Sequence, residues 1–244
     1  MKIKFIIFKL FPRIFTRFFK SLYKHKLGYN LSELIKRGLK IDVVYDIGAY
    51  RAEWSKSLNQ TSLKKKDFIL FEANQENEEY LKKTNFKYHI GVLSNERKKV
   101  NFYSRKLTGD SYYREQSERY DENYKPKIII TDTLDEVVEK KNLKLPNFIK
   151  IDTQGSEIDI LKGSGKTLKN CNLIYLETPI IEYNLNSPTL SECVSYLKSI
   201  NFIPFDICEV HFMDKVLIQI DILYINKLKF LELFPEGKSI DFLK

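Results

Sequence analysis

The sequence has few cysteines, few glycines and no long apolar run. Its three cysteines are scattered through the second half of the chain without any C-x-x-C spacing, which argues against a zinc site and against a disulfide framework. A reducing, cytoplasmic compartment is the expectation that follows. No apolar stretch reaches the roughly 20 residues that a membrane-spanning helix needs. No small-residue cleavage site of the signal-peptide kind is found either.

Glycine is absent from the positions that dinucleotide-binding and phosphate-binding loops require. A G-x-G-x-x-G fingerprint that begins at Gly48 would need glycine in place of Tyr50 and Glu53, so close approach of a pyrophosphate is disfavoured. The stretch 163–167 reads GSGKT, yet a P-loop ending there would need glycine in place of Ile160 and a strand before the loop. The sequence therefore argues against an NAD-dependent oxidoreductase and against a P-loop protein.

Positive charge is concentrated near the start of the chain. The net charge is +9, and residues 1–40 hold eleven Lys or Arg against the single acid Glu33. The rest of the chain holds 30 bases and 31 acids. A body so close to neutral does not support a nucleic-acid groove spread over the domain, so nucleic acid is not an expected partner.

Residues 1–40 form a basic, amphipathic segment that we expect to be helical from about Pro12. Basic residues recur every three or four positions, and aromatic or aliphatic residues fill the other faces. Two interpretations stay open. The helix packs on the domain or on a partner subunit of a homodimer, or it makes reversible, peripheral contact with the anionic inner face of a membrane.

Residues 41–244 alternate between apolar runs of strand length and segments with helical spacing, which predicts a mostly parallel sheet in an α/β domain. Two of the expected strands, 88–92 and 100–103, are short and lie on either side of a polar turn, so we expect them to pair as a hairpin. The other elements are expected as helices near 31–39, 49–59 and 77–83, as a helix that starts near Thr133 and another near 156–168, and as strands near 43–46, 67–72, 128–131, 147–152 and 172–177.

Four of these strands end in an acid, namely Asp46, Glu72, Asp152 and Glu177. The carboxyl ends of parallel strands meet at one edge of a sheet, so we expect the four carboxylates to share a ligand cleft there. Glu72 ends the next strand after the turn at Gly48, with one helix between them. A carboxylate in this position can accept the hydroxyls of a ribose. A glycine-poor turn followed by such an acid favours a nucleoside with a compact amino-acid tail, which points to S-adenosylmethionine.

A tyrosine-rich insertion near 104–127 breaks the alternation. Long loops of this kind in compact domains are usually functional, and tyrosines stack on sugar faces. We therefore expect the insertion to cover the acceptor and assign Tyr112 and Tyr113 to substrate binding. The alternative is a tolerated surface insertion.

Together the motifs resemble the FkbM family of S-adenosylmethionine-dependent methyltransferases over about 43–226. They are, in order, Tyr45–Ala49, Phe71–Asn74, Thr133–Asp135, Ile149–Glu157 with Leu161–Gly163, Glu177, and Gln219–Asp221. The resemblance implies a class I, Rossmann-like methyltransferase fold: a seven-stranded, mostly parallel sheet with an antiparallel last strand and helices on both faces. Residues 204–208 and 216–225 fit its closing hairpin.

The same resemblance implies a cofactor site for S-adenosylmethionine. Asp46, Gly48 and Ala49 would contact the methionine part of the cofactor, Glu72 the ribose, and residues near Val92 the adenine. Ala73 and Glu177 complete the expected cofactor set. Tyr50 also belongs to it, although it stands where the family often has asparagine.

A hydroxyl acceptor needs a group that removes its proton, and Asp152 is the first candidate because its strand faces the methyl group in this fold. Gln154 and Glu157 are expected to help. The alternative is that Asp152 caps the next helix and Glu157 fixes neighbouring backbone. His211, expected in the turn between the last two strands, is the second candidate base. Asp152 with Glu177 is an alternative Mg²⁺ site, but no metal is assigned.

The sequence thus predicts an O-methyltransferase that acts on a hydroxyl of a sugar, a glycan or a related metabolite. The rival from another class is a catalytically silent nucleoside-binding protein or membrane-recruited partner protein that kept the pocket. An NAD-dependent oxidoreductase is the weaker rival, because of Tyr50 and Glu53.

Overall fold

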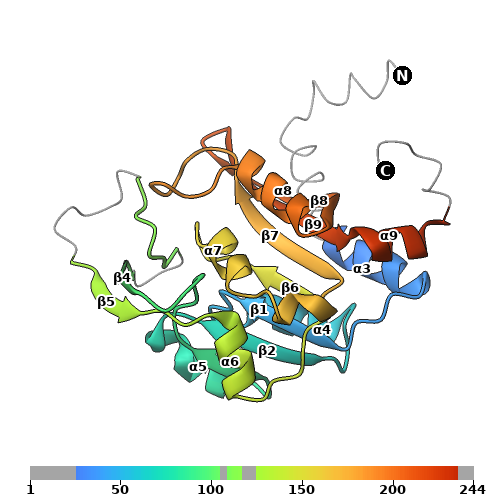
Figure 1. Ribbon diagram of the computed structural model, residues 1–244, viewed down its shortest axis with the longest axis horizontal. Coiled ribbons are helices and arrows are strands. Elements are labelled where there is room, and N and C mark those ends of the chain that lie inside the picture. Colours follow the sequence, from blue (N-terminus) through green and yellow to red (C-terminus); the bar gives the residue numbers. More distant parts are fainter. Residues whose placement is uncertain (1–25, 105–108, 117–124, 236–244) are drawn as a thin grey trace, which may run out of the picture.

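A seven-stranded sheet forms the centre of the molecule (Figure 1). The computed structural model describes residues 26–104, 109–116 and 125–235. The strand order is β3-β2-β1-β6-β7-β9-β8, and β9 pairs antiparallel with both of its neighbours, whereas the other pairings are parallel. This is the expected class I fold. In sheet order the strands are β3 Lys87–Ile90, β2 Asp67–Glu72, β1 Val43–Ile47, β6 Phe148–Ile151, β7 Leu173–Pro179, β9 Val216–Asn226 and β8 Phe202–Met213.

Helices cover both faces of the sheet, as expected. Side chains alternate between the faces along each strand, and two apolar cores result. One core is completed by α6 (Leu134–Lys140), α7 (Glu157–Lys162) and α8 (Leu190–Ser199). The other is completed by α3 (Lys26–Lys36), α4 (Glu53–Gln60), α5 (Glu78–Lys82) and α9 (Lys227–Leu233). Two 3-10 turns, η1 (Gln75–Asn77) and η2 (Thr167–Asn170), complete the described elements.

Helix α3 is amphipathic and belongs to the core of the domain. Leu27, Leu31 and Leu34 recur at helical spacing and are buried against the sheet. The Lys26 ammonium lies 2.6 Å from the Asp206 carboxylate of β8. The end of the basic segment therefore packs on the domain, while residues 1–25, which carry most of its positive charge, lie outside the described residues.

Strand β4 (Lys99–Phe102) does not pair with β3, so the predicted hairpin of 88–92 with 100–103 is wrong. It pairs antiparallel with β5 (Lys127–Ile130) in a separate two-stranded sheet, and β3 pairs in parallel with β2. The cause is Thr131, whose hydroxyl donates to the Glu96 carbonyl and accepts from the Lys98 N–H. These bonds hold the turn before β4 against the end of β5.

The GSGKT stretch is not a phosphate loop, as expected. The N–H groups of Lys166 and Thr167, which such a loop would offer to a ligand, donate to the Asp135 carboxylate at 2.8 Å each. Asp135 lies in the first turn of α6, where Thr133 and Glu136 form a capping box. The stretch therefore joins α7 and η2 to α6.

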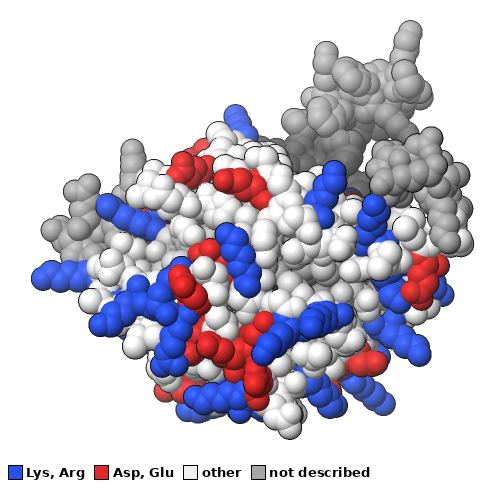
Figure 2. Space-filling model, in the orientation of Figure 1, with Lys and Arg blue, Asp and Glu red and all other residues white. Residues whose placement is uncertain are grey.

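Charge on the face shown in Figure 2 is mixed, because basic and acidic side chains lie beside one another. This agrees with the near-neutral balance of the chain after residue 40. Of the helices that the structure describes, none is both long enough and apolar enough to cross a lipid bilayer.

Candidate functional site

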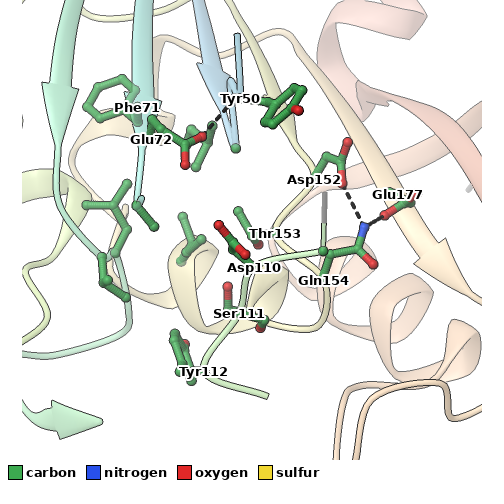
Figure 3. Close-up of a pocket in the computed structure, with 18 of the residues that line it drawn as sticks. Tyr50, Phe71, Glu72, Asp110, Ser111, Tyr112, Asp152, Thr153, Gln154 and Glu177 are labelled. Atoms are coloured by element: carbon green, nitrogen blue, oxygen red, sulfur yellow. Dashed lines mark hydrogen bonds between the residues drawn. The ribbon is translucent and has the colours of Figure 1, made fainter. Parts of the chain in front are cut away.

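A cavity of about 640 Å³ opens at the carboxyl ends of the central strands (Figure 3). Its volume is typical of a small-molecule site. Glu72, Asp152 and Glu177 line it together, so three of the four strand-end acids share one cleft, whereas Asp46 is not among the lining residues. Two ends can be distinguished. The Glu72 end is closed by Phe71, Val92 and Leu93, and the Asp152 end by Gln154, Glu177 and Gln219.

Gly48 joins the two ends because β1 lies between β2 and β6. Its φ is +75°, and a Cβ built there would lie 1.8 Å from the Asp152 carbonyl oxygen. Only glycine fits a turn whose backbone is approached this closely. The N–H groups of Gly48 and Ala49 both donate to the Phe71 carbonyl, so they hold β1 to β2. Gly48 lines the cavity, whereas Ala49 is buried in the core.

Glu72 is held in place by three neutral donors. Its Oε2 accepts from the Tyr50 N–H at 2.7 Å, and its Oε1 accepts from the Asn74 N–H at 2.8 Å and from the Asn77 side chain at 3.3 Å. Burial raises the pKa of Glu72, and these hydrogen bonds oppose the rise. A carboxylate has about four acceptor positions, so one on Oε2 remains for a ligand hydroxyl. Tyr50, at φ +48°, turns its side chain to the cavity.

Asp46 is fully buried on the face of the sheet that α4 covers. Its Oδ2 accepts from the Ser55 hydroxyl at 2.6 Å, and the Lys150 ammonium lies 3.1 Å from its Oδ1. The Lys150 ammonium also donates to the Gly48 carbonyl at 2.8 Å and lies 3.5 Å from Asp152. Burial lowers the pKa of Lys150, but the carboxylates of Asp46 and Asp152 outweigh it and raise the pKa. The ammonium therefore stays charged and holds both strand ends together.

Asp152 and Glu177 form a coupled pair of acids. Burial acts to raise the pKa of Asp152, but the Lys150 ammonium and hydrogen bonds from Glu177 and Gln154 lower it. Burial, Asp152 and Asp221 raise the pKa of Glu177 well above its ordinary value. The two acids are therefore shifted in opposite directions, Asp152 toward the ionised form and Glu177 toward the protonated form.

Gln154 bridges the two acids, as the dashed lines in Figure 3 show. Its side-chain amide donates to Asp152 at 3.0 Å and to Glu177. Its backbone has φ +57°, a conformation that non-glycine residues rarely adopt. The Asn184 side chain supports this loop by donating to the Gln154 carbonyl at 2.5 Å. Gln154 thus lies at the predicted site and holds the two carboxylates in a fixed relation.

Glu157 is 2% exposed and does not line the main cavity. Its carboxylate accepts from the N–H groups of Thr153 and Gly155. This is the structural alternative that the sequence left open, in which Glu157 fixes neighbouring backbone. Burial raises its pKa, and the backbone hydrogen bonds oppose the rise.

His211 lies within strand β8, so its predicted place in the turn after that strand is wrong. Strand β8 continues to Met213 because it pairs with β9 up to the Met213–Val216 register. The His211 Nε2 lies 3.0 Å from the Asp221 carboxylate, which raises the pKa of the imidazole.

Glu177, His211 and Asp221 offer ligand atoms within 4.8 Å of one another. Hydrogen bonds from Tyr175, His211 and Gln154 to the two acids account for this grouping without a metal.

Tyr112 and Tyr113 lie beside α7, with both hydroxyls donating to the Asp159 carboxylate at 3.0 and 3.1 Å. Tyr112 lines the cavity, whereas Tyr113 does not. Ala73 and Val92 line the Glu72 end of the cavity, where the sequence placed them.

Several residues that shape the site were not assigned a role from the sequence. Lys150 stands in the motif that carries Asp152, and a lysine inside an apolar strand was a signal that it needs buried acidic partners. Asp221 likewise stands in a motif, and interrupts an apolar strand. Asp159 gave no signal, since an acid in the first turn of a helix is common for other reasons.

Comparison with known proteins gives the family. A model described as "Methyltransferase FkbM domain" matches residues 46–204, which is well over half of the chain. The chain belongs to the FkbM methyltransferase family. Every strand-end acid of the predicted cleft falls within the FkbM match, whereas His211 and Asp221 follow it.

Solved methyltransferase structures resemble this FkbM chain at low identity. The FkbM methyltransferase of Methylobacillus flagellatus KT is 19% identical, with a TM-score of 0.49, over 77% of this chain and 45% of that one. The precorrin-6y C5,15-methyltransferase of Geobacter metallireducens GS-15 is 15% identical, with a TM-score of 0.44, over 79% and 84%. The plantazolicin methyltransferase BpumL, in complex with SAH, is 14% identical, with a TM-score of 0.43, over 98% and 84%. The chain thus spans less than half of the Methylobacillus protein. No curated protein matched it.

Proposed function

We propose that this protein is an S-adenosylmethionine-dependent O-methyltransferase whose acceptor is a hydroxyl of a sugar, a glycan or a related metabolite. The family match supports methyl transfer. The observation that carries the proposal is the shared cavity, in which Glu72 and the Asp152–Glu177 pair occupy opposite ends. One end suits a nucleoside and the other suits proton transfer.

The Glu72 end fits the nucleoside of the cofactor. Glu72 keeps an acceptor position on Oε2 for a ribose hydroxyl, because among the residues that the structure describes only Tyr50 donates to that oxygen. Phe71, Val92 and Leu93 supply the apolar walls that an adenine ring needs. When bound, S-adenosylmethionine supplies an electrophilic methyl group beside a positive sulfur, and the acidic lining of the cavity suits that charge.

At the other end, Asp152 orients the acceptor hydroxyl and takes its proton. The Asp152 side chain is 38% exposed, so a substrate can reach it, and Lys150 keeps it ionised. Gln154 fixes its direction through the hydrogen bond to Oδ1. Alignment of the acceptor with the methyl group is the larger contribution in such a displacement, because it removes the need to bring two reactants together.

The residues that line the wall of the cavity formed by 109–116 support the proposal that the acceptor carries hydroxyl groups. Ser111 and the carboxylates of Asp110 and Glu115 line it, and these groups accept hydrogen bonds from hydroxyls. Tyr112 adds an aromatic surface, of the kind that packs against a sugar ring. An acceptor with several hydroxyls would meet a partner for each.

Cofactor binding tests the first half of the proposal. Thermal unfolding is measured with S-adenosylmethionine, S-adenosylhomocysteine and NAD, since a ligand at 100 times its Kd adds about 2.7 kcal/mol of stability. We expect the two adenosyl compounds to raise Tm and NAD to leave it unchanged. Glu72→Gln should weaken S-adenosylhomocysteine at least tenfold, whereas the exposed Glu79→Gln serves as the control. A Tm raised only by NAD would overturn the assignment.

Product formation tests the second half. Wild type and Asp152→Asn are incubated with S-adenosylmethionine and a panel of methyl glycosides, and methylated products are detected by mass. We expect Asp152→Asn to lose about a hundredfold in kcat while it still binds S-adenosylhomocysteine. Wild-type turnover in the variant would remove Asp152 from the chemistry. Cofactor binding with no product from any acceptor would favour the silent nucleoside-binding protein.

A further inference from the structure

Residues 109–116 of the tyrosine-rich insertion, here named the strap, form one wall of the cavity. In Figure 3, Asp110, Ser111 and Tyr112 lie across the open space from Tyr50 and Glu72. The first part of the strap is tied to the Glu72 end, because the Asn74 side chain donates to Asp110 at 2.7 Å. Paired bonds between Ser111 and Tyr103 hold it in a β-bridge.

The centre of the strap is fixed to α7 by two tyrosine hydroxyls. Those of Tyr112 and Tyr113 both donate to Oδ2 of Asp159, and the Tyr112 hydroxyl lies 3.1 Å from the Ser94 hydroxyl. The two rings pack on each other with centroids 5.0 Å apart. Burial and the Asp159 carboxylate raise the pKa of the Tyr113 hydroxyl, so it stays a donor. Both hydroxyls are therefore bound within the protein, and the assignment of the two tyrosines to substrate binding stays a prediction.

The last part of the strap contacts the loop after β7, and Tyr113 contacts the loop that carries Gln154. The Gln116 N–H donates to the Tyr183 carbonyl at 3.0 Å, and the Tyr183 hydroxyl donates to Glu115 at 2.5 Å. Tyr113 also packs on Gly155, where a Cβ would lie 3.1 Å from the Tyr113 ring. Glycine at 155, with φ +113°, thus leaves room both for Tyr113 of the strap and for Ser187, whose Cβ would lie 2.9 Å from an added Cβ.

We infer that Asp159 is a positioning residue for the acceptor: by holding Tyr112 and Tyr113, it fixes the strap as the wall that selects a polyhydroxylated acceptor. The acceptor contacts come from Ser111 and the carboxylates of Asp110 and Glu115. The inference rests on the proposed function, since the strap is an acceptor wall only if a methyl group is transferred in the cavity. Asp159 acts through the tyrosines and does not line the cavity itself.

Amide hydrogen exchange tests the anchoring without any acceptor. The reporters are the N–H groups of Tyr103 and Ser111, whose bonds tie the strap down. We expect exchange there to rise about tenfold in Asp159→Asn, because two partly buried hydrogen bonds to a carboxylate are weakened. Exchange in β1 should stay unchanged. The double variant Tyr112→Phe/Tyr113→Phe should behave in the same way and covers the case in which Asp159→Asn folds poorly.

The matched control is Tyr88→Phe. Its hydroxyl also donates to a carboxylate, that of Glu78 at 3.1 Å, but this bond joins β3 to α5 and involves neither the strap nor α7. It should leave exchange at the strap at the wild-type rate. Unchanged exchange in both strap variants would overturn the inference.

Steady-state kinetics then tests the role in acceptor selection. With the best methyl glycoside of the panel, we expect the strap variants to raise KM for the glycoside about tenfold and to leave KM for S-adenosylmethionine within about twofold. An equal rise in both KM values, or none in either, would overturn the inference. Failure of S-adenosylhomocysteine to bind wild type would instead overturn the proposed function, and hydrogen exchange would still decide the anchoring.

Discussion

The two ends of the cavity hold their carboxylates in opposite ways. At one end Glu72 accepts from three neutral donors, two of them backbone N–H groups, and the Asp110 carboxylate lies near enough to raise its pKa. At the other end Asp152, Glu177 and Asp221 lie near one another, and the buried Lys150 ammonium acts to lower the pKa of Asp152. Backbone N–H groups orient Glu72. The Asp152 end depends instead on the interaction of its acids with the Lys150 ammonium.

The difference separates binding from chemistry. Donors on fixed backbone hold one carboxylate in a set orientation, which suits recognition of a cofactor that must not react at that end. Crowded acids push their pKa values apart, so one keeps a proton while its neighbour is free to accept one. Four variants test how far this division holds.

The largest expected effect comes from Gly48→Ala, because Gly48 joins the two ends. The added Cβ would meet the Asp152 carbonyl, and the positive φ is strained for alanine. We expect a loss of more than about 3 kcal/mol in the free energy of unfolding, measured with urea. Gly38→Ala is the control, since Gly38 also has a positive φ but nothing within 4 Å of an added Cβ. It should cost about 1 to 2 kcal/mol. Equal losses of stability in Gly48→Ala and Gly38→Ala would show that the contact with the Asp152 carbonyl does not contribute to the cost.

Lys150→Met should damage only the Asp152 end. The variant leaves Asp46 buried without its cation, and removing one partner of a buried ion pair costs about 3 to 5 kcal/mol. Adding Asp46→Asn to this variant should recover part of the loss, because the unpaired charge is then gone. Calorimetric binding of S-adenosylhomocysteine reports on the Glu72 end. If the free energy of binding S-adenosylhomocysteine falls by as much as the free energy of unfolding, the two ends of the cavity do not act independently.

The pH dependence of stability should identify the crowded acid. Because the pKa of Glu177 is raised from its ordinary 4.5 on folding, the stability it contributes is present below that value. It is lost as pH rises through the raised pKa, with a slope of up to about 1.4 kcal/mol per pH unit. Glu177→Gln should flatten this decline in urea titrations from pH 4.5 upward. The lowered pKa of Asp152 acts in the opposite sense and only as pH falls below 3.8. If the slope of unfolding free energy against pH is unchanged in the variant, a group other than Glu177 carries the proton that is lost.

The smallest effect is expected from Asn77→Ala at the Glu72 end. The variant removes the 3.3 Å hydrogen bond to Glu72 Oε1 and leaves both backbone donors. A loss of about 1 kcal/mol corresponds to about fivefold weaker binding of S-adenosylhomocysteine by calorimetry. Gln75→Ala, in the same 3-10 turn, removes an amide that bonds to Glu78 instead. This control should bind normally, and a similar loss there would mean that the turn matters rather than the bond.

The fold was largely predictable from the sequence. Apolar runs of strand length that end in an acid or a small-residue turn gave the strands and their parallel order, and the family resemblance supplied the antiparallel β9. The pairing of β4 was not predictable, because it depends on Thr131, which lies more than 30 positions from the carbonyl and N–H groups that it bonds. The local sequence pattern cannot tell whether β4 pairs with the nearby strand β3 or with the distant strand β5.

The sequence by itself determined which carboxylates stand at strand ends, since that depends only on where each apolar run stops. The tertiary structure decided how deep in the sheet each one lies. Asp46 pairs in register with Leu70 and Lys150, so it lies two positions before Glu72 and Asp152 on the same face of the sheet, under α4, where it meets Lys150. Glu72 and Asp152, at or just beyond their strand ends, reach the cavity. A two-residue difference in register thus separates a buried ion pair from a ligand site, and only packing against the neighbouring strands and helices fixes that difference.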